Sequence, residues 1–347
     1  MKKNPSLIES IQEFFKNKTV EFKLAKTEKG PSATLFKFKL LNAILVDDIK
    51  SYEKELSEYL NGNNVRIEAP ILGTSYIGIT AQNEKQEFFY VEDLIKESKA
   101  KEKDLVIPIG KTIGNKIIYI DFFDNTHLAI SGSSGSGKSN FLVYLINVLT
   151  KRFSPEELKL VLADPKLVEF SIFKDSPYLM RPVIHKTTEA LSSIKELLAE
   201  MEVRYQILED TKNINIFSYN KTSKNKMPFI FFIADEISDF RLSGKDNESK
   251  IIREGLIHLL QMGKAVGINI IIATSRPCED ILPIPLLVNI FNRLAFKMAT
   301  ETNSKFFLDR LGAEKLTGNG EGLFCELDDK NLKIIQTPLF IEDEINL

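Results

Sequence analysis

The sequence is poor in the residues that build cross-links and metal centres. It has 2 cysteines, 3 histidines and no tryptophan in 347 residues. Cys278 and Cys325 lie far apart and form no CxxC pair, so we expect reduced thiols rather than a structural disulfide. His127, His185 and His258 show no ligand spacing, and we expect packing or surface roles for them. These absences exclude a disulfide scaffold and a metal centre built from cysteine or histidine.

Long apolar runs and an excess of charge are also missing. No stretch approaches the ~20 apolar residues of a membrane span, and the start MKKNPSLIES lacks the apolar core of a signal peptide. We therefore expect a cytoplasmic protein without a membrane span. With 46 Lys and Arg against 48 Asp and Glu, the formal net charge is -2. Any contact with nucleic acid must come from a local group of cations.

The residues that are present divide the chain into two parts. Hydrophobic residues make up 43% of it, which is typical of a globular protein. We expect residues 1–104 to form a small α+β domain, with a helix over 6–16 and alternating strand patterns such as SATLFKFKL. The highly charged stretch IKESKAKEKD, residues 95–104, is predicted to be a solvated linker in preference to a binding tail.

The pattern changes from Leu105 onward. Short apolar runs now recur between helical or polar stretches, namely HLAIS, LKLVLAD, FIFFIAD, INIIIAT and RLAFKMA. Such runs fit strands that are covered on both faces, as in a parallel sheet with crossover helices. We therefore predict an α/β domain over 105–347 with a mostly parallel sheet. Its ligands should bind at the carboxyl ends of the strands.

The stretch SGSSGSGKSN, residues 131–140, satisfies the Walker A pattern G-x-x-x-x-G-K-[ST]. In this pattern backbone N–H groups point at phosphate oxygens, the lysine neutralises the phosphates and the hydroxyl ligates Mg²⁺. The stretch alone could be a flexible Gly/Ser loop, but a strand precedes it and the helix NFLVYLINVLTKRF follows, which favours phosphate binding. The predicted nucleotide-binding residues are Gly132, Ser133, Ser134, Gly135, Ser136, Gly137, Lys138, Ser139 and Asn140.

The stretch FIFFIADEISDF supplies the carboxylates that hydrolysis of a phosphate needs. It places Asp235 and Glu236 directly after a buried strand. We expect Asp235 to hold Mg²⁺ together with Ser139, and Glu236 to orient or deprotonate the attacking water. Alone, the pair could be an acidic helix start, but together with the phosphate loop it favours hydrolysis over binding alone.

Two other strands also end in polar residues. INIIIATSRP ends in Thr274 and Ser275, which suit sensing of the γ-phosphate but could also form a plain turn before a proline. LKLVLAD continues into Asp164-Pro165-Lys166, which is either a turn or part of the nucleotide site. The residue types alone do not decide between these alternatives.

Together these segments resemble the motor of the FtsK/SpoIIIE family of double-stranded DNA translocases. The resemblance rests on HLAISGSSGSGKSN, LADPKLVEFSIF, FIADEISDF, GINIIIATSRP and LDRLGAEKLTGNGEGLF, and more weakly on KGPSATLFKFKL and NVRIEAPILGTSYIGI in the front part. The phosphate and carboxylate motifs are shared by all such ATPases, whereas the combination of DPKxxEF, ATxRP and LGAEKL is more specific. The resemblance implies a RecA-like P-loop fold, ATP and Mg²⁺ at sites between the subunits of a hexameric ring, and duplex DNA through its centre.

The resemblance also implies roles for residues outside the nucleotide motifs. It assigns Arg276 and Lys305 to loops that face DNA in the pore. Lys264 stands where the family usually has an arginine finger that reaches the neighbouring subunit's site, so Lys264 is a candidate catalytic residue in trans. Lysine supplies a positive charge but cannot form the two parallel hydrogen bonds that an arginine guanidinium makes to a phosphate. Another residue, such as Arg293, could serve instead.

Two further positions depart from the family pattern. Ser275 replaces the usual glutamine and would be a shorter sensor, and Glu301 replaces a DNA-facing lysine. The predicted function is nevertheless ATP-driven translocation along double-stranded DNA by a ring-shaped, hexameric ATP hydrolase. Two alternatives stay open: an ATPase of the same fold that moves protein, and a nucleotide-dependent scaffold with weak hydrolysis.

Overall fold

The backbone packs into two compact units. The computed structural model describes residues 6–42, 46–71, 74–85, 87–98, 105–240, 242, 244, 246–326 and 332–340. One unit is formed by residues 1–89 with 111–117, and the other by residues 90–110 with 118–347.

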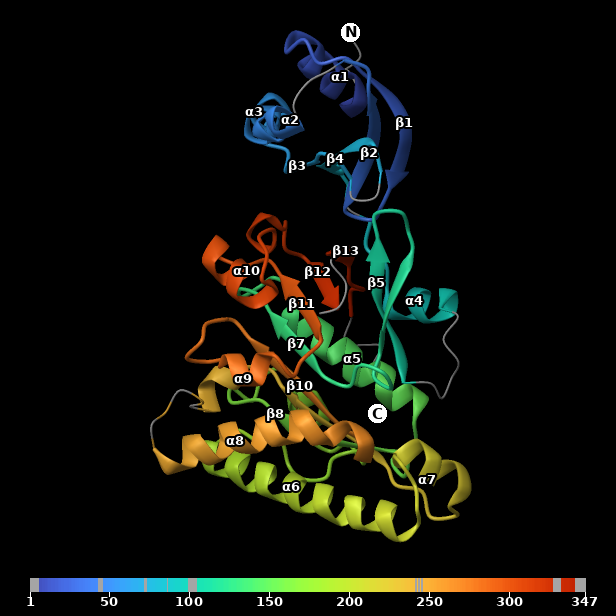
Figure 1. The fold of residues 1–347 in the computed structure, drawn as a ribbon, viewed down its shortest axis with the longest axis vertical. Coiled ribbons are helices and arrows are strands. Elements are labelled where there is room, and N and C mark those ends of the chain that lie inside the picture. Colours follow the sequence, from blue (N-terminus) through green and yellow to red (C-terminus); the bar gives the residue numbers. More distant parts are fainter. Residues whose placement is uncertain are drawn as a thin grey trace. The chain divides into compact units, whose positions relative to one another are not determined.

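The smaller unit packs helices on one face of an antiparallel sheet, which has four strands in the order β1-β2-β4-β3 among the described residues (Figure 1). Its first helix begins with a capping box, because the Ser6 hydroxyl accepts the Glu9 N–H and the Glu9 carboxylate accepts the Ser6 N–H. The elements are α1 (Leu7–Asn17), β1 (Phe22–Lys29), β2 (Ala33–Leu40), α2 (Val46–Ser51), α3 (Glu53–Tyr59), β3 (Val65–Glu68) and β4 (Tyr76–Gln82).

The larger unit is built around one mixed sheet, which has nine strands among the described residues. In chain order the strands are β5 (Val106–Thr112), β6 (Ile117–Asp121), β7 (Leu128–Ser131), β8 (Leu158–Ala163), β9 (Phe229–Ala234), β10 (Ile268–Thr274), β11 (Asn292–Phe296), β12 (Glu321–Glu326) and β13 (Lys333–Gln336). Across the sheet the order is β6-β5-β13-β12-β11-β7-β10-β9-β8.

Five adjacent strands of this sheet, β8, β9, β10, β7 and β11, run parallel to one another. This confirms the predicted α/β fold. The sequence did not indicate the extension beyond β11, where β12 and β13 pair antiparallel and β5 and β6 complete the edge. Since β10 lies between β7 and β9, the carboxyl ends of these three strands meet at one place.

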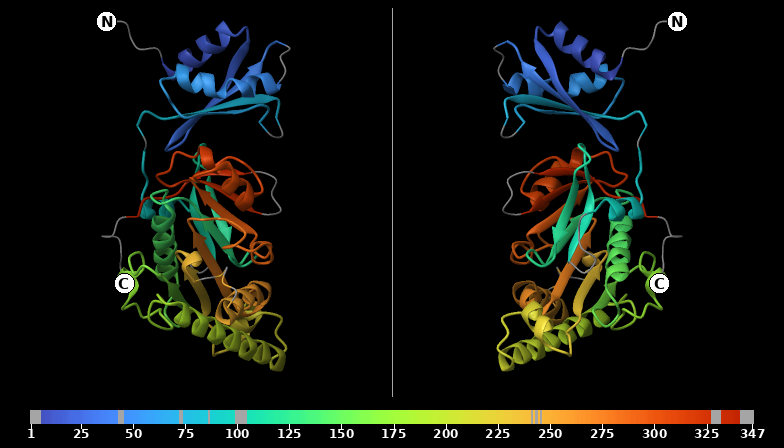
Figure 2. Two further views of the ribbon diagram at one scale, coloured as in Figure 1. Left: turned by 90° about the vertical axis from the view of Figure 1, so that its left-hand side faces the viewer. Right: turned by 90° about the vertical axis from the view of Figure 1, so that its right-hand side faces the viewer.

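Helices cover both faces of the parallel strands. The long helices α6 (Thr187–Asp210) and α8 (Asn247–Met262) lie side by side on one face (Figure 1), where Ile230 and Phe232 of β9 join their core. Helix α5 (Lys138–Arg152) runs along the other face (Figure 2). The remaining helical segments are α4 (Val91–Glu97), η1 (Ser171–Phe173), α7 (Ile216–Thr222), η2 (Ile237–Phe240), η3 (Gly263–Val266), α9 (Ile284–Leu287), α10 (Glu301–Leu308) and η4 (Ala313–Lys315).

The predicted linker falls at the start of the larger unit. Residues 95–97 form the last turn of α4, and residues 99–104 lie outside the described residues. The linker and the domain boundary at residue 104 therefore stay predictions. Cys278 is exposed and Cys325 is buried, and the two are not bonded to each other.

Candidate nucleotide-binding site

The phosphate loop connects β7 to α5 as the sequence predicts. Gly135 and Gly137 have φ angles of 73° and 113°, which lie in the left-handed region that glycine adopts without strain. Gly132 packs so tightly that an added Cβ would lie 2.6 Å from atoms of Phe296 and Ser136. The backbone therefore needs glycine at these positions, and α5 begins at Lys138 with its positive end directed at the loop.

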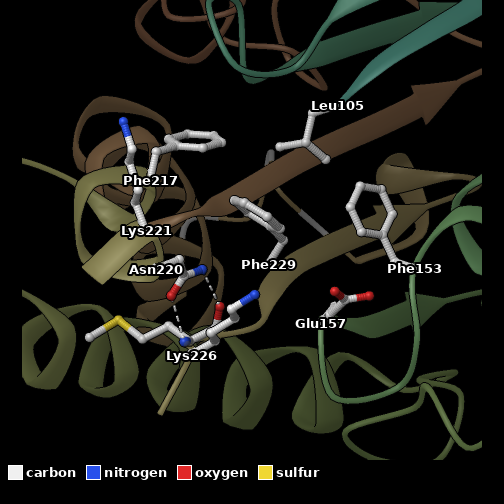
Figure 3. A pocket seen from close by; sticks show the side chains of 9 residues that line it. Leu105, Phe153, Glu157, Phe217, Asn220, Lys221, Lys226 and Phe229 are labelled. Atoms are coloured by element: carbon white, nitrogen blue, oxygen red, sulfur yellow. Dashed lines mark hydrogen bonds between the residues drawn. The ribbon is translucent and has the colours of Figure 1, made fainter. Parts of the chain in front are cut away.

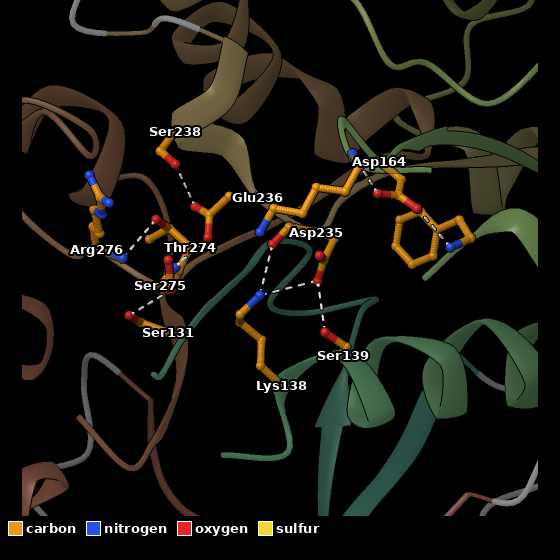
Figure 4. A network of polar contacts seen from close by, with 12 residues as sticks. Ser131, Lys138, Ser139, Asp164, Asp235, Glu236, Ser238, Thr274, Ser275 and Arg276 are labelled. Carbon is orange, nitrogen blue, oxygen red and sulfur yellow. Dashed lines mark hydrogen bonds and ion pairs between the residues drawn. The ribbon is translucent and has the colours of Figure 1, made fainter. Parts of the chain in front are cut away.

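Lys138 and Asp235 form a buried ion pair at the mouth of this loop. The Lys138 ammonium donates to the Asp235 backbone carbonyl and to its carboxylate, both at 3.1 Å. The Ser139 hydroxyl donates to the same carboxylate oxygen at 3.4 Å (Figure 4). The start of α5 and the end of β9, which are far apart in sequence, thus bring a cation, a hydroxyl and a carboxylate together, the set that binds phosphate with Mg²⁺.

Glu236 lies next to this pair and is held in a fixed orientation. Its two carboxylate oxygens accept hydrogen bonds from the Ser238 hydroxyl at 2.7 Å and from the Ser275 backbone N–H at 2.8 Å. Burial is the largest single influence and raises the pKa of Glu236, but hydrogen bonds from Thr274, Ser275 and Ser238 together outweigh it and lower the pKa below the usual value. The side chain is therefore ionised at neutral pH and able to accept a proton or orient a water.

The end of β10 connects the phosphate loop to Glu236. The Thr274 carbonyl accepts the Ser131 hydroxyl at 3.0 Å and the Gly132 N–H at 3.4 Å. The next residue, Ser275, binds Glu236 as described above. Ser275, at the predicted sensor position, thus contacts the Glu236 carboxylate through its backbone and its side chain.

Asp164 shapes a turn beside the site. It is fully buried, and its carboxylate accepts the backbone N–H groups of Lys166 at 3.1 Å and Phe170 at 3.0 Å. Lys166 and Glu169 extend from this turn to the wall of the nucleotide cavity. The cavity has a volume of about 400 Å³ and is lined by Ser133, Ser134, Gly135, Gly137, Lys138, Ser139, Asn140, Lys166, Glu169, Asp235, Glu236 and Ser275.

The C-terminal strands support the phosphate loop, which was not predicted from the sequence. The Gly320 N–H donates to the Ser136 carbonyl at 3.0 Å, and the Thr337 N–H and hydroxyl both donate to the Gly320 carbonyl, at 2.9 and 3.0 Å. The Asn140 amide exchanges two hydrogen bonds with the Phe340 backbone, at 3.0 and 3.3 Å. The sequence signal for this support is the run Gly318-Asn319-Gly320, in which all three φ angles are positive. The predicted nucleotide contact of Asn140 stays a prediction, because its amide holds Phe340.

The two candidates for a residue acting in trans lie in different environments. Lys264 is in η3, at the amino end of β10 and thus at the opposite edge of the sheet from Ser275, and its ammonium donates to the Asp124 carbonyl at 2.6 Å. Arg293 is buried and donates to the carbonyls of Leu287, Ile290 and Phe307 within its own chain. Arg293 is therefore a structural residue, and the alternative that it serves as the finger is wrong.

The two predicted DNA-binding residues, Arg276 and Lys305, differ in their surroundings. Arg276 is exposed at the edge of the polar network, and its backbone N–H donates to the Thr274 hydroxyl at 3.1 Å (Figure 4). Lys305 in α10 pairs with Asp309 at 3.2 Å and donates to its carbonyl at 2.9 Å. Glu301 adds a negative charge in the first turn of the same helix. Both DNA contacts stay predictions.

A separate cavity of about 250 Å³ opens where β8 and β9 begin, at the edge opposite to the phosphate loop. Phe153, Phe217 and Phe229 line it together with Lys221 and Lys226 on its rim (Figure 3). None of the predicted site residues lies in this cavity.

Within the part of the chain that the structure describes, no cluster of three or more His, Cys, Asp or Glu side chains could hold a metal ion. No helix of that part combines the length and apolar character that crossing a bilayer requires.

Comparisons with known families match both units of the chain. Residues 90–322 match the FtsK/SpoIIIE family, and residues 2–83 match the FtsK alpha domain. The chain is 36% identical over 346 residues to the DNA translocase FtsK of Leptospira interrogans, covering 96% of this chain and 36% of that protein. It is 34% identical over 349 residues to the DNA translocase FtsK of Caldanaerobacter subterraneus, covering 99% of this chain and 49% of that protein. The chain thus spans between about a third and a half of these relatives.

Solved structures with a similar fold include a conjugation coupling protein and a secretion ATPase. The pCW3 conjugation coupling protein TcpA, in its monomer form with ATPγS, superposes with a TM-score of 0.69 at 21% identity, covering 96% of this chain and 94% of that chain. The cytoplasmic domain of the type VII secretion ATPase EccC of Thermomonospora curvata gives a TM-score of 0.62 at 20% identity, covering 73% and 32%. At these identities the likeness shows the fold. The chain therefore belongs to the FtsK/SpoIIIE family, and its larger unit has the fold of a P-loop ATPase motor domain.

Proposed function

We propose that this chain is the ATP-driven motor of a double-stranded DNA translocase, working as a homo-oligomeric ring that is a hexamer. The hydrogen bond from the Ser275 N–H to Glu236 carries the proposal, because it joins the carboxylate expected to act on water to the segment that continues into Arg276. Relatives over nearly the whole chain that are named DNA translocase FtsK support DNA as the substrate.

ATP binding would use the backbone N–H groups of the glycine loop and the positive end of α5. Lys138 would exchange its bond to Asp235 for the β- and γ-phosphates, because the phosphate charge exceeds that of one carboxylate. Gly135 has nothing within 4 Å of an added Cβ, so the backbone there faces open space, which fits a phosphate cradle. Mg²⁺, held by Ser139 and Asp235, would neutralise charge on the phosphates.

Hydrolysis would depend on Glu236. Its lowered pKa keeps the carboxylate ionised, so it can orient the attacking water and accept its proton. The hydrogen bond from the Ser275 N–H ties this carboxylate to the segment after β10, so a change in the contacts of Glu236 during the ATP cycle would be transmitted to Ser275. Because Arg276 follows directly, the state of the nucleotide would shift a cation that contacts DNA phosphates.

Assembly into a ring would complete the site. Lys264 lies at the opposite end of β10 from Ser275, so one chain cannot bring both to the same phosphate. A head-to-tail neighbour would present its Lys264 to this cavity, as heterologous contacts in a closed ring do. Lysine would neutralise developing charge without the bidentate fork of arginine.

Steady-state ATP hydrolysis with and without long double-stranded DNA, at low and moderate salt, tests the proposal. We expect stimulation by duplex that is lost as salt rises, because contacts to phosphates release counterions. Lys138→Ala is the control and should abolish turnover in both conditions. Turnover that is indifferent to DNA would instead indicate a motor that moves protein, and tight ATP binding with negligible turnover would indicate a scaffold.

A further inference from the structure

The smaller unit carries a group of lysines on one face of its sheet. Cross-strand register places Lys23 directly opposite Lys39, and Lys26 directly opposite Lys37. Residues on the other face, such as Phe36 and Phe38, are buried under the helices. Side chains alternate along a strand, and the bulge between residues 24 and 26 shifts this alternation by one residue, so that Lys26 lies on the same face as Lys23. The four lysines therefore share the face that the helices do not cover.

Only part of this charge is compensated. Lys26 and Lys37 share the carboxylate of Glu28, at 2.8 and 2.9 Å. Among the described residues, Lys23 and Lys39 form no ion pair. Directly opposite residues on neighbouring strands have Cβ atoms ~5 Å apart, where like charges destabilise the sheet. The repulsion between Lys23 and Lys39 thus destabilises the smaller unit, and folding alone does not explain why both positions are lysine.

The charges of this unit are sorted by element. Strands β1 and β2 contain five lysines and one glutamate, whereas α2 and α3 contain five acidic residues and two lysines. A solvated surface without a partner has no need for this separation, because mixed charges keep a protein soluble equally well. Strand β3 adds Arg66 and Glu68, one charge of each sign, and β4 adds none. The sheet therefore presents a local cationic surface on a chain whose net charge is -2.

Protection of the sheet edge does not account for the lysines. Lysine on an edge strand discourages pairing with other chains, and β1 is an edge strand. Lys37 and Lys39, however, belong to β2, which is hydrogen-bonded on both sides to β1 and β4. The exposed ring of Tyr76 lies directly opposite Lys39 on β4 and continues the same row.

We propose that this face, defined by Lys23, Lys26, Lys37, Lys39 and Tyr76, binds the phosphate backbone of duplex DNA. The proposal rests on the proposed function, to which it adds a DNA contact in the smaller unit. Lys23 and Lys39 supply charge to phosphates, and the Tyr76 hydroxyl supplies a hydrogen-bond donor. The contact is independent of base sequence, since phosphates carry no sequence information.

The test compares two double variants of the full chain that lose the same charge. Lys23→Gln with Lys39→Gln removes the uncompensated pair, and Lys50→Gln with Lys54→Gln removes two exposed lysines from α2 and α3. Binding to a fluorescein-labelled duplex of mixed sequence is measured by anisotropy over a series of salt concentrations. We expect the slope of log K against log salt to fall by about 1.8 for the sheet variant, or about 0.9 for each lost phosphate contact, and to be unchanged for the helix variant.

The outcomes separate this proposal from the proposed function. If the unmodified chain binds duplex and the sheet variant has the same slope and affinity, the proposed surface is wrong and the proposed function stands. If the unmodified chain binds no duplex, both fail. Thermal unfolding checks that the sheet variant is folded. Because it removes like charges that face each other, it should be at least as stable as the unmodified chain, whereas a merely structural role for these lysines predicts lower stability.

Discussion

Glu236 combines deep burial with ionisation, and its three hydroxyl-bearing neighbours explain how. Only 3% of the residue is exposed, which by itself favours the protonated form. Hydrogen bonds from the side chains of Thr274, Ser275 and Ser238 and from the Ser275 backbone stabilise the charge. The carboxylate is thus positioned before any substrate arrives, which lowers the cost of orienting it in the reaction.

We expect Glu236→Gln to bind ATP and fail to turn it over. Glutamine keeps the shape and can still accept the hydrogen bond from the Ser275 N–H, but it cannot accept a proton. The rate of hydrolysis should fall by a factor of about 10² or more, the usual contribution of a positioned general base. Nucleotide affinity by calorimetry and turnover by phosphate release measure the two effects. Glu169→Gln, on the wall of the same cavity, is the control, and near-normal turnover in Glu236→Gln would remove Glu236 from the mechanism.

His127 makes the stability of the protein depend on pH. Burial lowers its pKa from 6.5 to about 4, the nearby charge of Lys264 lowers it further, and the Leu260 carbonyl offsets part of the shift. Between these two values the unfolded chain binds a proton that the folded chain excludes. The free energy of unfolding therefore falls as pH decreases below 6.5, until the folded pKa near 4 is reached.

Replacement of His127 should remove this part of the acid sensitivity. Its Nδ1 accepts the Ile270 N–H at 3.1 Å, and the side-chain carbonyl of glutamine is an acceptor that does not titrate. Between pH 7 and pH 5, His127→Gln should lose roughly 2 kcal/mol less stability than the unmodified chain, from one proton over 1.5 pH units. Denaturant unfolding at both pH values gives the difference. His258→Gln, at an exposed position, is the control for the substitution itself, and an equal acid sensitivity in His127→Gln and the unmodified chain would contradict the assignment.

At the scale of elements, the turn before β12 acts on the phosphate loop by close backbone contact. Gly320 has a φ of 82°, and an added Cβ would lie 2.8 Å from the Thr337 hydroxyl. An added Cβ on Gly137 would likewise lie 2.8 Å from the Gly320 backbone. Two glycines, one in each segment, thus let the two backbones touch, and any shift of the turn must move the loop.

We expect Gly320→Ala to weaken ATP binding as well as stability. A left-handed alanine costs about 1–2 kcal/mol, and the clash with Thr337 displaces the turn that supports the loop. Gly62→Ala is a matched control, because Gly62 has a φ of 80° and nothing within 4 Å of its added Cβ. Both variants should lose stability in denaturant unfolding, and only Gly320→Ala should lose nucleotide affinity in calorimetry. Equal affinities would show that the turn does not position the loop.

At the scale of the whole molecule, β10 connects two candidate sites in the larger unit, the nucleotide cavity at its carboxyl end and Lys264 at its amino end. Its carboxyl end carries Thr274 and leads to Arg276, and its amino end follows the segment with Lys264. A subunit therefore has its own nucleotide cavity at one edge of the sheet and the residue proposed to act on a neighbour at the other. In the proposed ring, this arrangement would make activity a property of pairs of chains.

Mixing two inactive variants should restore activity. Lys264→Ala keeps an intact phosphate loop, and Lys138→Ala keeps an intact Lys264. At a junction where the first supplies the loop and the second supplies Lys264, all groups are present. We expect the ATPase rate of the equimolar mixture to exceed the mean of the two separate rates. Without any gain on mixing, Lys264 would act within its own chain or not at all, and Lys264→Arg shows whether the charge alone suffices.

The nucleotide loop could be predicted from the sequence because its determinants are local. The glycines at 135 and 137 permit positive φ angles, and Lys138 and Ser139 follow at fixed spacing whatever the rest of the chain does. The carboxylates Asp235 and Glu236 could be predicted because carboxyl ends of parallel strands meet at one edge. The family and the fold class followed from the same short segments, and the comparisons confirm both.

The rest of the site depended on contacts between residues far apart in sequence. Whether Arg293 is a finger or a structural residue is decided by the three carbonyls around it, which come from α9, the segment after it and α10. The support of the loop by Gly320 and Thr337 exists only because β12 and β13 extend the sheet. Sequence by itself determined the chemistry of the loop and the strand ends, since these depend on local backbone geometry and residue type. Tertiary structure alone decided which charges are buried and which backbones touch, because strand order in a sheet is not set by order in the chain.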